Sequence, residues 1–343
     1  MRTYYRPIPM ADPAFVPGAK PLAGGWCRFT HLECLSRENP ARIIPIEAVP
    51  PDVLKRLTAP RAPIAGLSMD RPRIMGILNL TPDSFSDGGC YNSMDAAVQR
   101  ADEMLGQGAD LLDLGGESTR PGAVEVAVEV EIERTAPIIA ALKHSAITAP
   151  ISIDTRKSLV AEAALVAGAD VINDISGLAF DPALADMAAR TGAILILMHS
   201  RGLPATMQDD PCYDHVLLDV YDALADSVAL AEATGIPRTR IMVDPGIGFG
   251  KRDPHNLALL HRISLFHSLG CAILLGVSRK GMIGRLSGAG MGMARGPASA
   301  TVGLWALGQG VQMLRVHDID IHRQMISLWG AASGTNRGKK EQA

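Results

Sequence analysis

Residues 74–89 read IMGILNLTPDSFSDGG, an apolar run that ends in a loop of amide, hydroxyl and carboxylate side chains. The run Ile74–Leu78 is short and almost entirely aliphatic, which is typical of a strand that is covered on both faces. The loop from Asn79 onward places hydrogen-bonding groups where this strand reaches the surface. We therefore expect the loop to bind a ligand.

The same pattern recurs along the chain: an apolar run ends in a polar residue, and an Ala-rich segment of helical length follows. The expected strands are Ile74–Leu78, Asp110–Leu114, Ile151–Asp154, Val171–Asp174, Ala193–Met198, Ile241–Asp244, Ala272–Val277 and Met313–Val316. Strands that alternate with helices form a parallel sheet. Eight such units favour closure into a (β/α)8 TIM barrel over an open α/β sheet.

Three segments are expected along the chain. The barrel should occupy residues 73–332, and residues 333–343 form a C-terminal tail that we predict to be disordered. Twelve of the 23 prolines lie in residues 1–72, so this N-terminal extension should be mostly irregular. Within it, Ile43–Leu57 looks like a strand that turns at two prolines into a short helix.

The composition excludes several classes of protein. Apolar residues make up 47% and charged residues 20%, as in a globular protein with a large core. The net charge is -3, and the only basic cluster is the short run Arg337–Lys340, so nucleic acid is not an expected partner. No apolar run approaches the roughly 18 residues that cross a bilayer, and we expect a cytoplasmic protein without membrane contact. The five cysteines lack metal-binding spacing and are interpreted as reduced thiols.

Ligands of (β/α)8 barrels bind at the carboxyl ends of the strands. Nearly every expected strand here ends in a hydrogen-bonding or charged group. These groups are Asn79, the segment Gly115–Gly122, Asp154, Asn173, Met198, Asp244, the segment Ser278–Lys280 and the segment Arg315–His317.

Six of these strings resemble, in sequence and in order, the dihydropteroate synthase family. They are NLTPDSF (79–85), GESTRPG (116–122), DISG (174–177), DPGIGFGK (244–251), SRK (278–280) and RVHD (315–318). One such string is weak support, but six in this order are specific. The resemblance implies an enzyme that joins 6-hydroxymethyl-7,8-dihydropterin pyrophosphate to p-aminobenzoate, forming 7,8-dihydropteroate and pyrophosphate in folate synthesis. It also implies that sulfonamides compete for the p-aminobenzoate pocket.

The resemblance assigns the pterin to Asp154, Asn173, Asp244 and Lys280, with Met198 as an apolar wall. Carboxylates, an amide and an ammonium group suit the donors and acceptors along a pterin edge. Asp154 has an alternative role, because it precedes an expected helix and could cap it.

The pyrophosphate is expected to need Mg2+ and cationic donors. The resemblance assigns this role to Asn79, as the metal ligand, and to Thr119, Arg120, Arg315 and His317. It does not extend to His199, for which a structural role is the better interpretation.

The reaction displaces pyrophosphate from a methylene group on an electron-rich ring, so an SN1-like path is expected. Buried carboxylates would stabilise the developing cation, and the expected catalytic residues are Asp154, Asp244, Lys280 and Asp87. The p-aminobenzoate pocket is assigned to Phe85, Thr119, Pro121, Phe249, Ser278 and Lys280. Phe85 could instead pack on the rim of the barrel. No dedicated general base is expected.

Two other functions remain open at this point. A pterin-binding methyltransferase domain would share the Asp and Asn residues but would not need the strings at 119–120, 278–280 and 315–317. A barrel that binds pterin without catalysis is the second alternative. The family resemblance also implies a homodimer, and Gly296–Gly308, which carries Trp305, could pack against a second copy or against the barrel.

Overall fold

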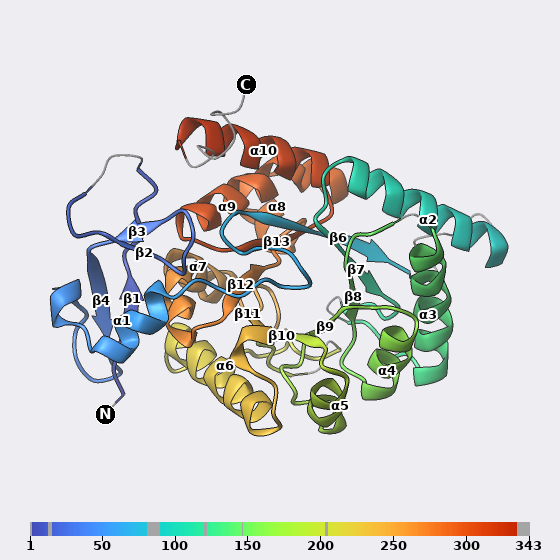
Figure 1. Ribbon diagram of the computed structural model, residues 1–343, viewed down its shortest axis with the longest axis horizontal. Helices are drawn as coiled ribbons and strands as arrows, with labels where there is room; N and C mark the ends of the chain where they lie inside the picture. The colour runs from blue at the N-terminus through green and yellow to red at the C-terminus, as the bar shows by residue number, and fades with distance from the viewer. Residues whose placement is uncertain are drawn as a thin grey trace.

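The computed structural model describes residues 2–12, 16–80, 90–119, 122–145, 147–202 and 205–334, without the side chains of residues 90–93. Eight parallel strands close into a barrel in the order β10-β11-β12-β13-β6-β7-β8-β9, with helices around the outside (Figure 1). The predicted (β/α)8 barrel is confirmed. Most of the C-terminal tail, residues 335–343, lies outside the described residues.

The barrel strands are β6 (Arg73–Asn79), β7 (Leu111–Gly115), β8 (Ile151–Asp154), β9 (Val171–Asp174), β10 (Ile194–Met198), β11 (Ile241–Asp244), β12 (Ala272–Leu275) and β13 (Met313–Val316). The helices between and after them are α2 (Cys90–Gly106), α3 (Val128–His144), α4 (Ser158–Val166), α5 (Ala183–Thr191), α6 (Val216–Ala233), α7 (Asp253–His261), α8 (Gly281–Ser287), α9 (Gly296–Gly308) and α10 (Ile319–Ala332). The prediction placed the end of β12 at Val277, which is wrong. Pairing with β13 stops at Leu275, and the chain then turns toward the polar end of the barrel.

The N-terminal extension contains more regular structure than its proline content suggests. β1 (Tyr4–Pro7), β4 (His31–Leu35) and β5 (Arg42–Pro45) form an antiparallel sheet, and β2 (Lys20–Pro21) pairs with β3 (Arg28–Phe29). The short helices η1 (Ile46–Ala48) and α1 (Pro51–Thr58) follow. The strand and helix expected within Ile43–Leu57 are therefore present. A small core that includes Phe29, Leu32 and Leu57 holds the extension together.

One end of the barrel is closed by the segment that joins α1 to β6, which crosses the barrel in Figure 1. Ile64 and Met69 of this segment are each 1% exposed and pack on Met75, Leu111 and other residues near the amino ends of the strands. Burying each such side chain contributes about 1.5–3 kcal/mol. The carboxyl ends of the strands, where the polar groups lie, form the opposite end.

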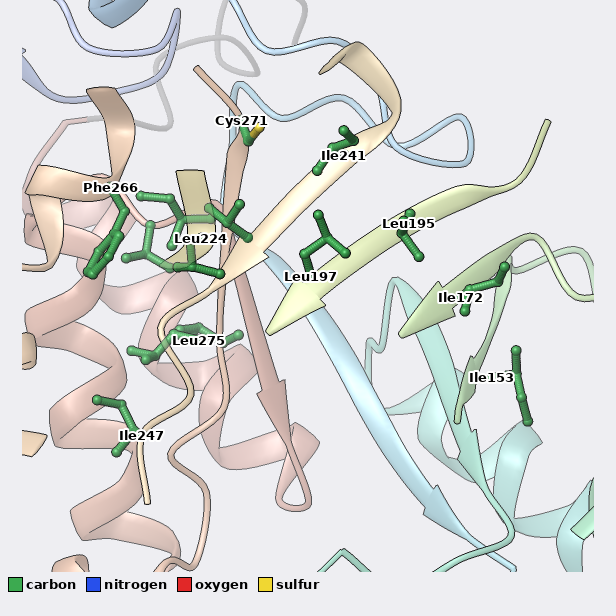
Figure 2. Close-up of a cluster of buried hydrophobic side chains, with 14 of the residues drawn as sticks. Ile153, Ile172, Leu195, Leu197, Leu224, Ile241, Ile247, Phe266, Cys271 and Leu275 are labelled. Carbon is green, nitrogen blue, oxygen red and sulfur yellow. The ribbon is translucent and has the colours of Figure 1, made fainter. Parts of the chain in front are cut away.

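The main core lies between the strands and the surrounding helices. Figure 2 shows side chains of consecutive strands, from Ile153 to Leu275, in this layer, with Leu224 of α6 against them. Within the described part of the chain, no helix combines the length and apolar character needed to span a membrane. Cys27, Cys34, Cys212 and Cys271 are free thiols there, as expected.

Candidate active site

Arg315, near the end of β13, lies between two buried carboxylates. Its Nε donates to Asp113 Oδ2 at 2.6 Å, and its Nη2 donates to Asp154 Oδ2 at 2.7 Å. Asn173 Nδ2 also donates to Asp113 Oδ2, at 3.2 Å. The ends of four strands thus bring three of the predicted residues, Asp154, Asn173 and Arg315, to one place.

Asp113 was not predicted from the sequence. It is fully buried, and its Oδ1 atom and that of Asp154 have no hydrogen-bond partner among the described residues. Buried acceptors are rarely left unpaired in folded proteins. The available signal was a carboxylate inside the otherwise apolar strand Leu111–Gly115, directly before the Gly-rich loop.

The alternative role of Asp154 as a helix cap is wrong. α4 begins after Lys157, and the backbone N–H of Ser158 donates to Asp181 Oδ2 at 2.8 Å. Asp154 is held instead by Arg315. Burial raises the pKa of Asp154 to about 7, and the Arg315 guanidinium opposes this shift.

Asp244 and Lys280 form the other half of the site. Gly246 N donates to Asp244 Oδ1 at 2.7 Å, and burial raises the pKa of Asp244. Burial lowers the pKa of Lys280 to about 8, while the carboxylate of Asp244 opposes that shift. A Cβ atom at Gly276 would lie 3.7 Å from Asp244 Oδ2 and 3.8 Å from Arg315 Cβ, so the two halves adjoin.

The loop after β11 is held from within by Lys251. Its buried Nζ donates to the carbonyl oxygens of Gly246 at 2.9 Å and Phe249 at 3.0 Å, and lies 2.8 Å from His199 Nδ1. Burial and the charge of Lys251 lower the pKa of His199 to about 2, so its imidazole is neutral. Gly246 has φ of 68°, and a Cβ atom there would lie 1.9 Å from His199 O, which excludes any side chain. These contacts give His199 a structural role.

The remaining predicted residues lie around this centre. Phe249 places its ring centroid 4.3 Å from Lys280 Nζ. Ser278 Oγ accepts from His317 N at 3.1 Å and lies 3.0 Å from its Nδ1. The others stand at strand ends or in the following loop, namely Met198 at the end of β10, Asn79 at the end of β6 and Thr119 after β7. Phe85, Asp87, Arg120 and Pro121 lie outside the described residues.

A buried ion cluster supports the loop that carries Thr119. Lys157 Nζ donates to Glu117 Oε2 at 2.5 Å and to Glu131 Oε2 at 2.7 Å, and Arg156 Nη2 donates to Glu117 Oε1 at 3.0 Å. Glu117 Oε2 also accepts the backbone N–H of Val126 at 3.1 Å. Two cations face two anions, so the cluster ties the loop after β7 to α3 and to the segment after β8.

The Glu117→Gln variant is expected to lose about 3 kcal/mol of unfolding free energy, because it leaves Arg156 and Lys157 with Glu131 as their only buried carboxylate partner. Urea denaturation monitored by circular dichroism measures this loss. Glu125→Gln is the matched control on the same loop, since the Glu125 side chain is 53% exposed at 3.5 Å from Arg156. Equal stability of the two variants would contradict the proposed importance of the buried cluster.

Comparison with known proteins gives a consistent result. The family described as "Pterin binding enzyme" matches residues 75–317. The dihydropteroate synthase of Escherichia coli K12 is 44% identical over 253 residues, which cover 74% of this chain and 89% of that protein.

Two solved structures are similar in both fold and sequence. The Xanthomonas albilineans dihydropteroate synthase with 4-aminobenzoic acid has a TM-score of 0.74 at 42% identity, covering 80% of this chain and 98% of that one. The Yersinia pestis dihydropteroate synthase in a sulfonamide drug complex has a TM-score of 0.73 at 41% identity, covering 78% and 96%.

Proposed function

This chain belongs to the dihydropteroate synthase family of pterin binding enzymes, and we propose that the polar end of its barrel carries out the family's reaction. It is a transferase of folate biosynthesis that condenses 6-hydroxymethyl-7,8-dihydropterin pyrophosphate with p-aminobenzoate to 7,8-dihydropteroate and pyrophosphate. The ion pairs of Arg315 with Asp113 and with Asp154 are the observation that supports placing the site at this end of the barrel. The methyltransferase and non-catalytic alternatives are not favoured, since the similar proteins are synthases.

We assign the pterin ring to Asp154, Asn173, Asp244 and Lys280, with Met198 as the apolar wall. The carboxylates, the amide and the ammonium group match the donors and acceptors along the ring edge. The unpaired Oδ1 atoms of Asp113 and Asp154 support this assignment, because ring N–H groups would supply the missing donors.

The proposed chemistry relies on charge and not on a strong base. As pyrophosphate leaves, positive charge develops on the pterin methylene group, and the buried carboxylates of Asp154 and Asp244 stabilise it. The arylamine of p-aminobenzoate then attacks and loses its proton to water. Phe249, Ser278 and Lys280 adjoin this position, while Thr119, Arg315 and His317 supply donors for the pyrophosphate.

Mg2+ is the cofactor that we propose, with the side-chain oxygen of Asn79 as its protein ligand. Asn79 is half-buried at the carboxyl end of β6, and Mg2+ prefers such oxygen donors, with water and substrate phosphates as its other ligands. The bound ion would neutralise charge on the departing pyrophosphate.

Asn79→Ala is expected to raise the Mg2+ concentration needed for half-maximal rate by roughly tenfold or more. Asn39→Ala, in the N-terminal extension, is the control, and an equal response of both variants would exclude Asn79 as ligand.

The direct test of the function is detection of 7,8-dihydropteroate by mass spectrometry. Purified protein is incubated with the dihydropterin pyrophosphate, p-aminobenzoate and Mg2+, and a parallel reaction omits p-aminobenzoate. Product in the complete reaction alone supports the synthase. Absence of product from protein that binds the pterin would favour the methyltransferase or the non-catalytic barrel.

Sulfonamides are expected to inhibit competitively with p-aminobenzoate, because both present an arylamine and an anionic group to the same pocket. Increasing p-aminobenzoate should raise the inhibitor concentration for half inhibition in proportion, with an unchanged maximal rate. Initial rates over a grid of both concentrations measure this. A maximal rate that falls with inhibitor at saturating p-aminobenzoate would contradict a shared pocket.

We propose a homodimer that uses the outer face of α9 and α10. Trp305 is 50% exposed, although its indole N–H donates to Leu260 O at 2.9 Å, and Leu328 is 73% exposed. Exposed apolar side chains of this size are common at subunit interfaces. Light scattering that gives the mass of one chain would exclude the dimer.

The cytoplasmic location expected from the sequence stays a prediction.

A further inference from the structure

A cavity of about 190 Å³ lies at the closed end of the barrel, opposite the proposed active site. The end of α1 and the following loop form one wall, and the other is formed by η3 (Arg238–Arg240) and the amino ends of β11 and β12. Figure 2 shows Ile241 and Cys271, which line the cavity, at the end of these strands away from Ile247. The cavity therefore exists only where the N-terminal extension meets the barrel.

Three arginines line this cavity: Arg56 and Arg61 from the extension, and Arg238 from the barrel. Gly270 lies where two of them meet, since a Cβ atom there would be 3.0 Å from Arg56 Cγ and 3.3 Å from Arg238 Cδ. The positive charge of Arg238 is close enough to lower the pKa of Arg61, to which burial makes the larger contribution.

The arginines are only partly neutralised by carboxylates. Arg56 pairs with Asp52 at 3.3 Å, and Arg238 pairs with Glu232 at 2.5 Å. Arg61 has no carboxylate partner in the described part of the chain. Its guanidinium donates instead to four backbone carbonyl oxygens, those of Arg56, Ala59, His267 and Cys271, which leaves one N–H group for another acceptor.

The three arginines and their two carboxylate partners therefore leave one uncompensated positive charge at the cavity. Cys271 does not offset it, because burial raises the pKa of its thiol to about 12. The Asp52 side chain is 75% exposed, so its ion pair with Arg56 is screened by water and contributes little. Glu232 accepts two hydrogen bonds from Arg238, whose Nη1 also donates to Leu269 O at 3.1 Å, so Arg238 keeps one N–H on each Nη atom for a further acceptor. Arg56 Nε is buried and has no hydrogen-bond acceptor among the described residues. A buried donor without an acceptor indicates a missing partner.

We propose that this cavity binds a small oxyanion of the phosphate type, held by Arg56 and Arg238, with Arg61 contributing positive charge. Guanidinium groups present N–H donors in the geometry that phosphate oxygens accept. The volume corresponds to about six water molecules, which accommodates phosphate or pyrophosphate. Arg56 and Arg61 lie before the part of the chain that matches the family, residues 75–317.

The bound anion would link the extension to the barrel, because its ligands come from both. Hydrogen–deuterium exchange of the full-length protein tests this, with inorganic phosphate compared with chloride at equal ionic strength. We expect residues 54–67 and 238–241 to exchange when the extension separates from the barrel. A phosphate concentration of ten times the dissociation constant should then slow their exchange by about tenfold. A parallel titration with pyrophosphate distinguishes the two anions.

Arg56→Gln and Arg238→Gln should each abolish this protection. Arg240→Gln, on the same turn but outside the cavity, should retain it. Phosphate bound at the proposed active site would protect both segments equally in Arg238→Gln, so the variants separate the two sites. Exchange that is unchanged by both anions, or protection that survives in Arg56→Gln and Arg238→Gln, would overturn the proposal.

Discussion

Lys280→Ala is expected to lower kcat/KM for dihydropteroate formation by about 10²–10³, the loss typical when one preorganised electrostatic group is removed. The ammonium group of Lys280 lies beside Phe249 and interacts electrostatically with Asp244. Removing it eliminates a donor to the pterin and leaves a buried carboxylate less compensated. Initial rates followed by mass spectrometry of the product measure the loss. Arg285→Ala is the control on α8, since the Arg285 side chain is 63% exposed.

The pH dependence separates the charge of Lys280 from its size. Burial lowers the pKa of Lys280 to about 8, so the protonated form is lost as the pH rises through that value. We expect the wild-type rate to fall above pH 8. Lys280→Arg should be slower at neutral pH but should not show this fall, because a guanidinium stays protonated. The same decline in both proteins would show that another group titrates.

The barrel could be predicted because its signal is local and repeated. Each strand is a short apolar run, and segments of helical length separate successive strands; parallel strands covered on both faces require such runs. The end of β12 was placed two residues too late, because Gly276 and Val277 continue the apolar run after the pairing with β13 has stopped. Apolar composition does not specify where a ladder ends.

The extension was harder to predict because its structure is held by distant contacts. Tyr4 pairs with Leu35 across more than two dozen residues, and Arg6 reaches Glu33 at 2.6 Å. Pairings between segments that are far apart leave no periodic pattern in a proline-rich sequence. The sequence of Ile43–Leu57 was informative because a strand, two prolines and a helix follow one another directly.

The site was predictable where a residue belongs to a known string and unclear where it does not. Asp244 and Lys280 belong to such strings, and Asn173 lies one residue before the end of β9, so topology brings all three to the same end of the barrel. Asp113 has no motif of its own and precedes the end of its strand by two residues. Glu117 belongs to a family string, but its pairing with Lys157 depends on how two adjacent loops pack, which the sequence does not specify.

Arg315→Met is expected to have the largest combined effect, because it leaves Asp113 and Asp154 buried without their shared cation. Breaking a buried ion pair from one side costs about 3–5 kcal/mol. We expect a loss of unfolding free energy of that size, together with loss of product formation. Urea denaturation and the mass-spectrometric assay measure the two effects separately.

The double variant Asp113→Asn/Arg315→Met tests the charge argument directly. Asparagine removes one of the two uncompensated charges, so the double variant should recover part of the stability without recovering activity.

The pH dependence of the unfolding free energy should also reflect the missing charge of Arg315. Burial already raises the pKa of Asp154, and without Arg315 that pKa rises further, so the folded state binds a proton more tightly than the unfolded chain. The stability deficit of Arg315→Met relative to the wild type should therefore shrink as the pH falls from 7 toward 5, because the buried neutral histidines, such as His199, are common to both proteins. Losses that simply add in the double variant, or a stability deficit that does not shrink over this range, would show that Arg315 acts by packing and not by charge.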